Sequence, residues 1–136
     1  MTDYYSSPQA VITRTGVEPA DLGLDEESDP DAALQGFLVD LLTELAEMIN
    51  RKIKRNYLAL FDAGKITAIP VGLVGIVADI AADSIRTMVA TRQTPVVRID
   101  DFAVTVLRSR VFSPDVLERL KLYGKRGLGS LMLTNR

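Results

Sequence analysis

Apolar residues that recur at helical spacing over residues 31–60 constrain the fold of this chain most strongly. They follow one another every three or four positions, as one face of an α-helix requires, while charged residues occupy the other faces. Asp29 and Pro30 supply an N-cap and a first-turn proline. Such a helix measures roughly 45 Å and needs a partner along its whole apolar stripe. The stripe consists of Leu34, Phe37, Leu38, Leu41, Leu42, Leu45, Met48, Ile49, Ile53, Tyr57 and Leu60.

A second amphipathic stretch runs from about Pro70 to Arg92, and Thr94-Pro95 breaks it. It is the one predicted helix of comparable length. Because it covers only part of the longer stripe, we expect another copy of the chain to cover the remainder. The apolar face of the second helix comprises Leu73, Ile76, Val77, Ile80, Ala81, Ile85, Met88 and Val89.

Shorter stretches carry their own boundary signals. Ser7 is the cap of a short predicted helix that ends near Arg14. Residues 18–31 are acidic and interrupted by Pro and Gly, which favours a solvated loop or a linker. Ser113, followed by Pro and Asp, begins a last helix that Gly124 ends.

Residues 96–106 alternate apolar and polar side chains around Asp100-Asp101, which is typical of a β-hairpin with a two-residue turn. This pairing places Ile99 opposite Phe102. The sequence therefore predicts a mainly α fold with a small β-hairpin, built as a small helical bundle of two long and one or two short helices.

The chain contains neither His nor Cys. This excludes thiol nucleophiles, disulfides, zinc sites with nitrogen or sulfur ligands, and the usual general base near neutral pH. We expect no enzyme activity, no metal and no cofactor. The first residues lack the pattern of a signal peptide, and the apolar residues 66–78 are too few to span a bilayer, so no membrane partner is expected.

The net charge of −2 conceals an asymmetry along the chain. Residues 1–47 carry eleven acids and one base, whereas residues 48–136 carry fifteen bases and seven acids. Either one monomer has two oppositely charged faces, or the acidic side of one copy meets the basic side of the next. Such complementarity sets orientation and partner choice.

Two groups of charged residues are candidates for contacts between subunits. Three lie on one face of the second long helix and form a stripe of ion pairs, either on the surface or between subunits. Others belong to the basic cluster of residues 51–55. This cluster could also stabilise the C-terminal end of the helix, where positive charge is favourable, or contact nucleic acid without reading its sequence. The candidates for intersubunit contact are Asp79, Asp83, Arg86, Arg51 and Arg55.

The final residues, 125–136, begin with two bases and carry four large apolar side chains. This segment has little capacity to form a core of its own. It is either a final strand or frayed end of the monomer, or a docking arm that orders on a partner. The candidate docking residues are Lys125, Arg126, Leu128, Leu131, Met132 and Leu133.

The order of these parts resembles the head–tail connector (adaptor) family of tailed bacteriophages over roughly residues 4–124. The resemblance lies in an N-terminal arm, two long helices, the string V-x-I-D-D-F-x-V from Val97, then Phe112-Ser113-Pro114-Asp115 and a helix containing Leu120-Lys121-Leu122-Tyr123. The acidic stretch 18–31 is longer than the family pattern, so the resemblance leaves its role open.

The family implies a structural neck protein whose helical protomers form a dodecameric ring beneath the portal. The chain would divide into an arm at 1–30, a helical core at 31–124 and a portal-docking tail at 125–136. The hairpin would contact a ring neighbour or the next component through Ile99, Asp100, Asp101 and Phe102. The implied partners are other copies, the portal, a downstream neck or tail protein and, passively, packaged DNA. The implied location is the neck of the virion, after synthesis in the host cytoplasm.

Two other classes of protein remain open. Another phage neck protein, which closes the head or completes the tail, is expected to be richer in β structure. A cytoplasmic helical regulator that binds nucleic acid is expected to be retained on DNA in a salt-dependent manner.

Overall fold

The computed structural model describes residues 2–91 and 101–124 of the chain. These residues are mainly helical, with 73% helix, and they contain no strand. The helices are α1 (Pro8–Thr15), α2 (Pro30–Ile53), α3 (Tyr57–Asp62), α4 (Val71–Thr91), α5 (Asp101–Val111) and α6 (Pro114–Leu120), with 3₁₀ turns η1 (Pro19–Leu22) and η2 (Lys121–Tyr123).

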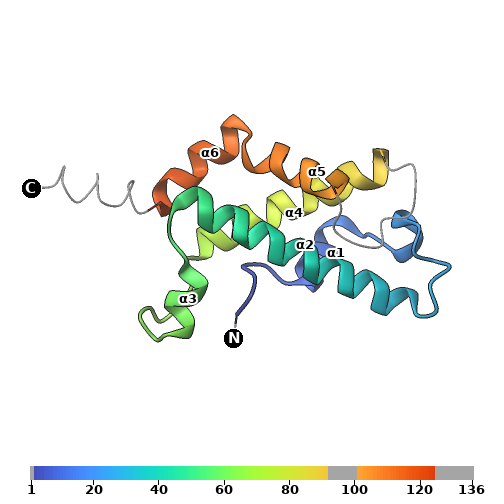
Figure 1. The fold of residues 1–136 in the computed structure, drawn as a ribbon, viewed down its shortest axis with the longest axis horizontal. Coiled ribbons are helices and arrows are strands. Elements are labelled where there is room, and N and C mark those ends of the chain that lie inside the picture. The colour runs from blue at the N-terminus through green and yellow to red at the C-terminus, as the bar shows by residue number, and fades with distance from the viewer. Residues whose placement is uncertain (1, 92–100, 125–136) are drawn as a thin grey trace, which may run out of the picture.

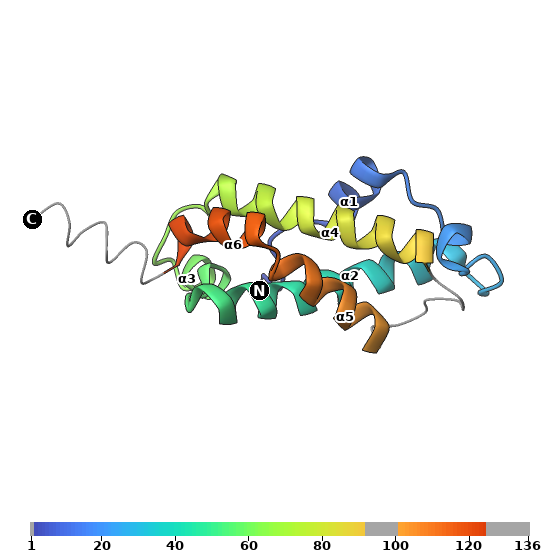
Figure 2. The same ribbon diagram turned by 90° about the horizontal axis from the view of Figure 1, so that it is seen from above.

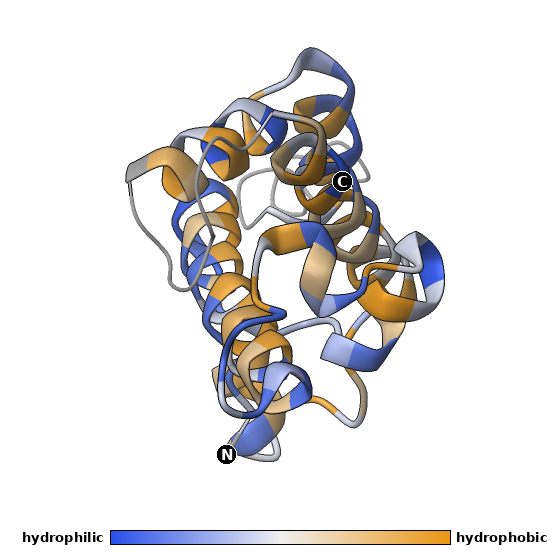
Figure 3. Ribbon diagram, turned by 90° about the vertical axis from the view of Figure 1, so that its right-hand side faces the viewer, coloured by the Kyte–Doolittle hydropathy of each residue, from blue (hydrophilic) through white to orange (hydrophobic). Residues whose placement is uncertain are grey.

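The two long helices, α2 and α4, run along the length of the molecule (Figures 1 and 2). On one side α5 packs against both of them and α6 packs against α4, while α1 packs against both from the other side. Figure 3 shows apolar and polar residues on opposite sides of the helices. The core therefore lies between the two long helices and the shorter ones that cover them.

Local capping explains the helix starts that the sequence predicted correctly. Ser7 Oγ accepts a hydrogen bond from Ala10 N at 3.1 Å, and Asp29 Oδ1 accepts one from Ala32 N at 3.2 Å. Ser113 caps α6 in the same way. The predicted second long helix is also confirmed, as α4.

The predicted continuous helix over 31–60 is wrong, because the helix breaks at Lys54. This residue adopts a left-handed conformation with φ 58°, and α3 begins after it. Asn56 Oδ1 accepts a hydrogen bond from Ala59 N at 2.9 Å and so caps α3. Both helices still bury the predicted stripe, which is why its periodicity did not reveal the break.

The predicted hairpin is wrong in its second half, since residues 101–111 form α5. The apolar residues of this segment fit a helical period as well as an alternating one: Ala103, Val106, Leu107 and Val111 are all buried. Contact with α2 and α4 decides between the two patterns, and it overrides the β preference of the valines. Residues 96–100, the first half, lie outside the described residues.

Most of both apolar stripes is covered within the chain, contrary to our expectation that another copy would be needed to cover part of them. Leu38, Leu41 and Leu45 on α2 are fully buried. Part of the cover comes from the acidic segment 18–31, because its Leu22 and Leu24 are also fully buried. In the described part of the chain, the large apolar side chains left exposed are Phe61, Val71, Val89, Phe102, Phe112 and Leu122.

Candidate functional site

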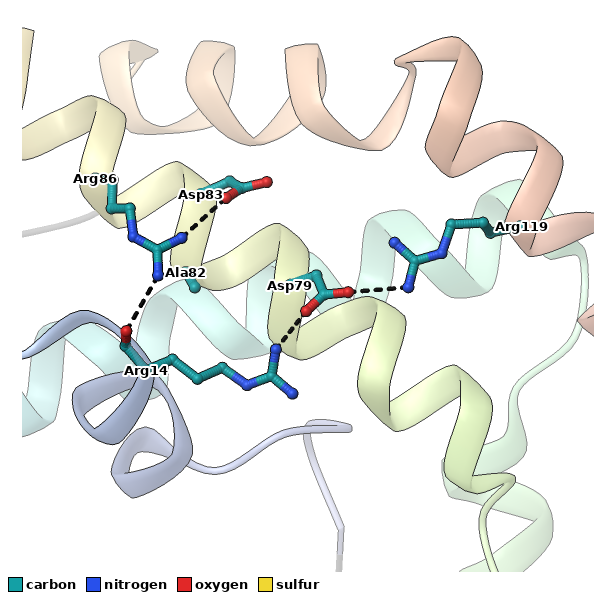
Figure 4. Close-up of a pocket in the computed structure, with 6 residues that line it drawn as sticks. All are labelled: Arg14, Asp79, Ala82, Asp83, Arg86 and Arg119. Carbon is teal, nitrogen blue, oxygen red and sulfur yellow. Dashed lines mark hydrogen bonds and ion pairs between the residues drawn. The ribbon is translucent and has the colours of Figure 1, made fainter.

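A charged hollow of about 290 Å³ lies where α1, α4 and α6 meet (Figure 4). Its charged side chains are between 39% and 56% exposed, so the hollow is open to solvent. The lining residues are Arg14, Asp79, Ala82, Asp83, Arg86 and Arg119.

Helical spacing brings these residues together. Asp79, Asp83 and Arg86 are separated by four and three positions on α4, so they share one face. Arg14 and Arg119 lie in the last turns of α1 and α6, where a base complements the helix dipole. The sequence predicted the face of α4, but not which distant residues pack against it.

Asp79 is the shared partner of two arginines from different helices. One carboxylate oxygen accepts a hydrogen bond from Arg14 Nη1, and the other accepts one from Arg119 Nη2 at 2.9 Å (Figure 4). This single carboxylate therefore joins both α1 and α6 to α4.

The two arginines keep Asp79 ionised. Burial of the carboxyl group opposes ionisation, but hydrogen bonds from Arg119 and Arg14, together with their charges, outweigh it. The pKa of Asp79 is consequently lower than its ordinary value. An ionised carboxylate with both oxygens engaged is suited to holding helices together rather than to donating a proton.

Arg86 makes a second connection between the same helices. Its Nη1 lies 3.1 Å from Asp83 Oδ1, and its Nη2 donates to the Arg14 carbonyl oxygen at 3.1 Å. That carbonyl belongs to the last turn of α1, where no helical N–H is in position to satisfy it. Asp79, Asp83 and Arg86 thus make contacts within their own chain, and a role for them between subunits stays a prediction.

A network of tyrosines surrounds the break between α2 and α3, and sequence reasoning missed it. Tyr5 Oη donates to Asn50 Oδ1 and accepts a hydrogen bond from Tyr57 N at 3.2 Å. Tyr57 Oη in turn donates to the Tyr123 carbonyl oxygen at 2.8 Å. The network joins both ends of the described chain to the α2–α3 corner, and no periodic pattern could have revealed contacts at such separations.

Burial dominates the titration of this network. It raises the pKa of Tyr5 to about 12, although hydrogen bonds from the backbone of Tyr57 and Leu58 act in the opposite direction. Burial also raises the pKa of Tyr57. Both phenols are therefore neutral at physiological pH and available as hydrogen-bond donors.

A second hollow of about 290 Å³ lies beside α2 and α3, and its lining includes Thr2 and Asp62. The backbone N and the Oγ1 of Thr2 each donate to the Asp62 carboxylate at 2.8 Å. These hydrogen bonds lower the pKa of Asp62. They fasten the first residues of the chain to the end of α3.

The remaining predicted site residues are dispersed. Arg51 lies in the last turn of α2 and Arg55 in the link to α3, both outside the charged hollow. The Arg55 guanidinium lies 5.3 Å from the Tyr57 ring centre. Asp101 and Phe102 begin α5 and not a hairpin, and their contact with a neighbouring component stays a prediction. The other predicted residues lie outside the described part of the chain: Ile99, Asp100, Lys125, Arg126, Leu128, Leu131, Met132 and Leu133.

Comparisons of the chain with protein-family models, with curated proteins and with solved structures give no match. In residues 2–91 and 101–124, no helix has the length and apolar character needed to cross a membrane. The same residues contain no group of three or more carboxylates arranged to hold a metal ion.

Proposed function

We propose that this chain is a structural subunit of the head–tail adaptor of a tailed bacteriophage. In this proposal the copies form a dodecameric ring beneath the portal, which extends the DNA channel and joins head to tail in the virion neck. Residues 125–136 dock on the portal, and a downstream neck or tail protein binds the opposite side of the ring. The subunit works through contacts alone, without catalysis.

The observation that carries the proposal is an apolar segment that follows a body with a buried core of its own. Gly124, the last described residue, packs closely on Ile53 at the end of α2. The described helices already bury their apolar faces against one another. Four large apolar side chains then follow between positions 128 and 133. Such a segment is suited to binding a groove on a partner.

The secondary structure supports the adaptor over the other neck proteins that we considered. Head-closure and tail-completion proteins are expected to be rich in β structure, whereas this chain is mainly helical. The mainly helical body also agrees with the fold that the resemblance implies.

Charged residues without ion-pair partners among the described residues lie at both ends of α2. They support a head-to-tail contact between copies. Residues 25–29, just before α2, carry four exposed acids. At the other end of the helix, roughly 36 Å away, Arg51 is exposed and makes no ion pair with any described residue. In the proposed ring, Arg51 and Arg55 of one copy contact the acidic loop of the next, and heterologous contacts of this kind can form a ring.

The test is to mix the purified chain with the portal protein of the same phage and to image the product by electron microscopy. We expect a ring of adaptor density on the intact portal. We expect a variant without residues 125–136 to keep its helical circular dichroism signal and to lose the ring. Equal binding by the truncated chain would reject the docking tail, and no binding by the intact chain would reject the adaptor proposal.

A further inference from the structure

The basic residues at the end of α2 continue onto α5 and form a surface distinct from the charged hollow. Lys52 Nζ lies 5.7 Å from the centre of the Phe112 ring, and that side chain is 48% exposed. Phe112 N donates to the Arg108 carbonyl oxygen at 3.0 Å, so Arg108 lies one helical turn earlier on the same side. Lys52, Arg108 and Phe112 are here named the α2–α5 basic surface.

The cations of this surface have no ion-pair partner among residues 2–91 and 101–124. Lys52 and Arg108 are both exposed, and neither of them forms an ion pair with another described residue. By contrast, Arg14, Arg86 and Arg119 each pair with a carboxylate on α4. Uncompensated charges that are close together produce a local positive potential, even on a chain whose net charge is −2.

We infer that the α2–α5 basic surface binds the phosphodiester backbone of duplex DNA. Ammonium and guanidinium groups are the usual partners of backbone phosphates, and they bind without reading sequence. The Phe112 ring holds the Lys52 side chain by a cation–π contact and so limits its freedom before binding. Neither of the two hollows described above is lined by these residues.

The inference deepens the DNA contact in the proposed function, and it rests on that function for the choice of duplex DNA. The surface shares no residue with the proposed docking tail. The two proposals can therefore be tested separately, with the free chain and DNA in one experiment and with the portal in the other.

Fluorescence anisotropy with two duplexes of unrelated sequence tests the inference. Two phosphate contacts predict a slope of about −1.8 for log affinity against log salt, or a loss of roughly 12-fold between 50 and 200 mM salt. Both duplexes should bind alike. The Lys52→Ala/Arg108→Ala variant should bring the slope close to zero, because it removes both contacts.

A matched control removes the same charge elsewhere. Arg110 lies two positions after Arg108, but its Nη2 donates to Thr87 Oγ1 on α4 at 3.1 Å, so it lies on the opposite side of α5. Lys65 is an exposed lysine beyond α3. The Lys65→Ala/Arg110→Ala variant should therefore keep the slope and affinity of the unchanged chain.

Three results would overturn the inference: no binding to duplex DNA at 50 mM salt, an equal loss in the two double variants, or tighter binding to single-stranded DNA than to the duplex. Circular dichroism identifies any variant that fails to fold, and the single Arg108→Ala and Arg110→Ala variants then provide the same comparison. Portal binding by the Lys52→Ala/Arg108→Ala variant should be unchanged. A failure of DNA binding alone thus leaves the adaptor proposal standing.

Discussion

The bases on α1, α4 and α6 and those on the α2–α5 basic surface have the same charge but different contacts. Arg14, Arg86 and Arg119 are held by carboxylates of α4, and through them three helices are joined. Lys52 and Arg108 have no such partner within the described residues. The residues that pack beside a base therefore decide whether it stabilises the fold or remains available to a partner. Local sequence does not reveal which residues these are.

The largest effect on stability is expected when an apolar side chain is removed from the core, and it should exceed the effect of breaking an ion pair. Leu24, in the acidic segment, is fully buried. We expect Leu24→Ala to lower the free energy of unfolding by about 2–5 kcal/mol, because it leaves a cavity in the core. Urea denaturation measures the change. Leu122 is 60% exposed, and Leu122→Ala should change stability by less than about 0.5 kcal/mol. Equal effects would contradict the burial described here.

The next effect concerns the tyrosine network. Tyr5→Phe leaves Asn50 Oδ1 and Tyr57 N without their partner, while it keeps the ring that fills the core. We expect a loss of about 1–3 kcal/mol in the free energy of unfolding. Tyr4→Phe is the matched control, since Tyr4 is only partly buried against the core. A neutral Tyr5→Phe would show that the corner is held by packing alone.

The pH dependence sharpens this prediction. The folded pKa of Tyr5, about 12, exceeds its ordinary value of 10.0. The stability linked to this group is therefore fully present below pH 10 and is lost as the pH rises toward 12. Between these values we expect the stability gap between the unchanged chain and Tyr5→Phe to narrow. A constant gap across that range would contradict a raised pKa.

A smaller effect is expected at Asp79, because its ion pairs are open to solvent. We expect Asp79→Asn to cost about 1 kcal/mol at pH 7. The folded pKa of Asp79 lies below the model-compound value of 3.8, so its contribution is present above that pH and is lost as the pH falls through the folded pKa. The difference between the two proteins, followed by thermal unfolding, should therefore shrink in acid. A gap that grows in acid would contradict the assignment.

The smallest effect is expected on the α2–α5 basic surface. Lys52→Ala/Arg108→Ala removes two exposed cations without ion-pair partners in the described chain, so stability should change by less than about 0.5 kcal/mol. The same variant should weaken DNA binding as described above. A loss of stability larger than that of Asp79→Asn would remove the distinction between the two groups of bases.

Features that depend on short stretches of sequence could be predicted. The caps at Ser7, Asp29 and Ser113 and the apolar face of α4 depend on neighbours within one or two helical turns. The break after Lys54 and the helical state of residues 101–111 depend on tertiary contacts, because each segment also fits another pattern. In the charged hollow, the face of α4 was predicted, whereas Arg14 and Arg119 were not, since they lie 65 and 40 positions from Asp79.

The central claim is that the apolar segment beyond the folded body docks on the portal. Sedimentation velocity of the chain mixed with the portal tests it most directly. The probe is a variant in which Leu128, Leu131, Met132 and Leu133 are all replaced by Ser, so that the length and charge of the tail are kept. We predict that the intact chain sediments with the portal and that the serine variant, folded and helical, sediments alone. Co-sedimentation of both, or of neither, would contradict the account.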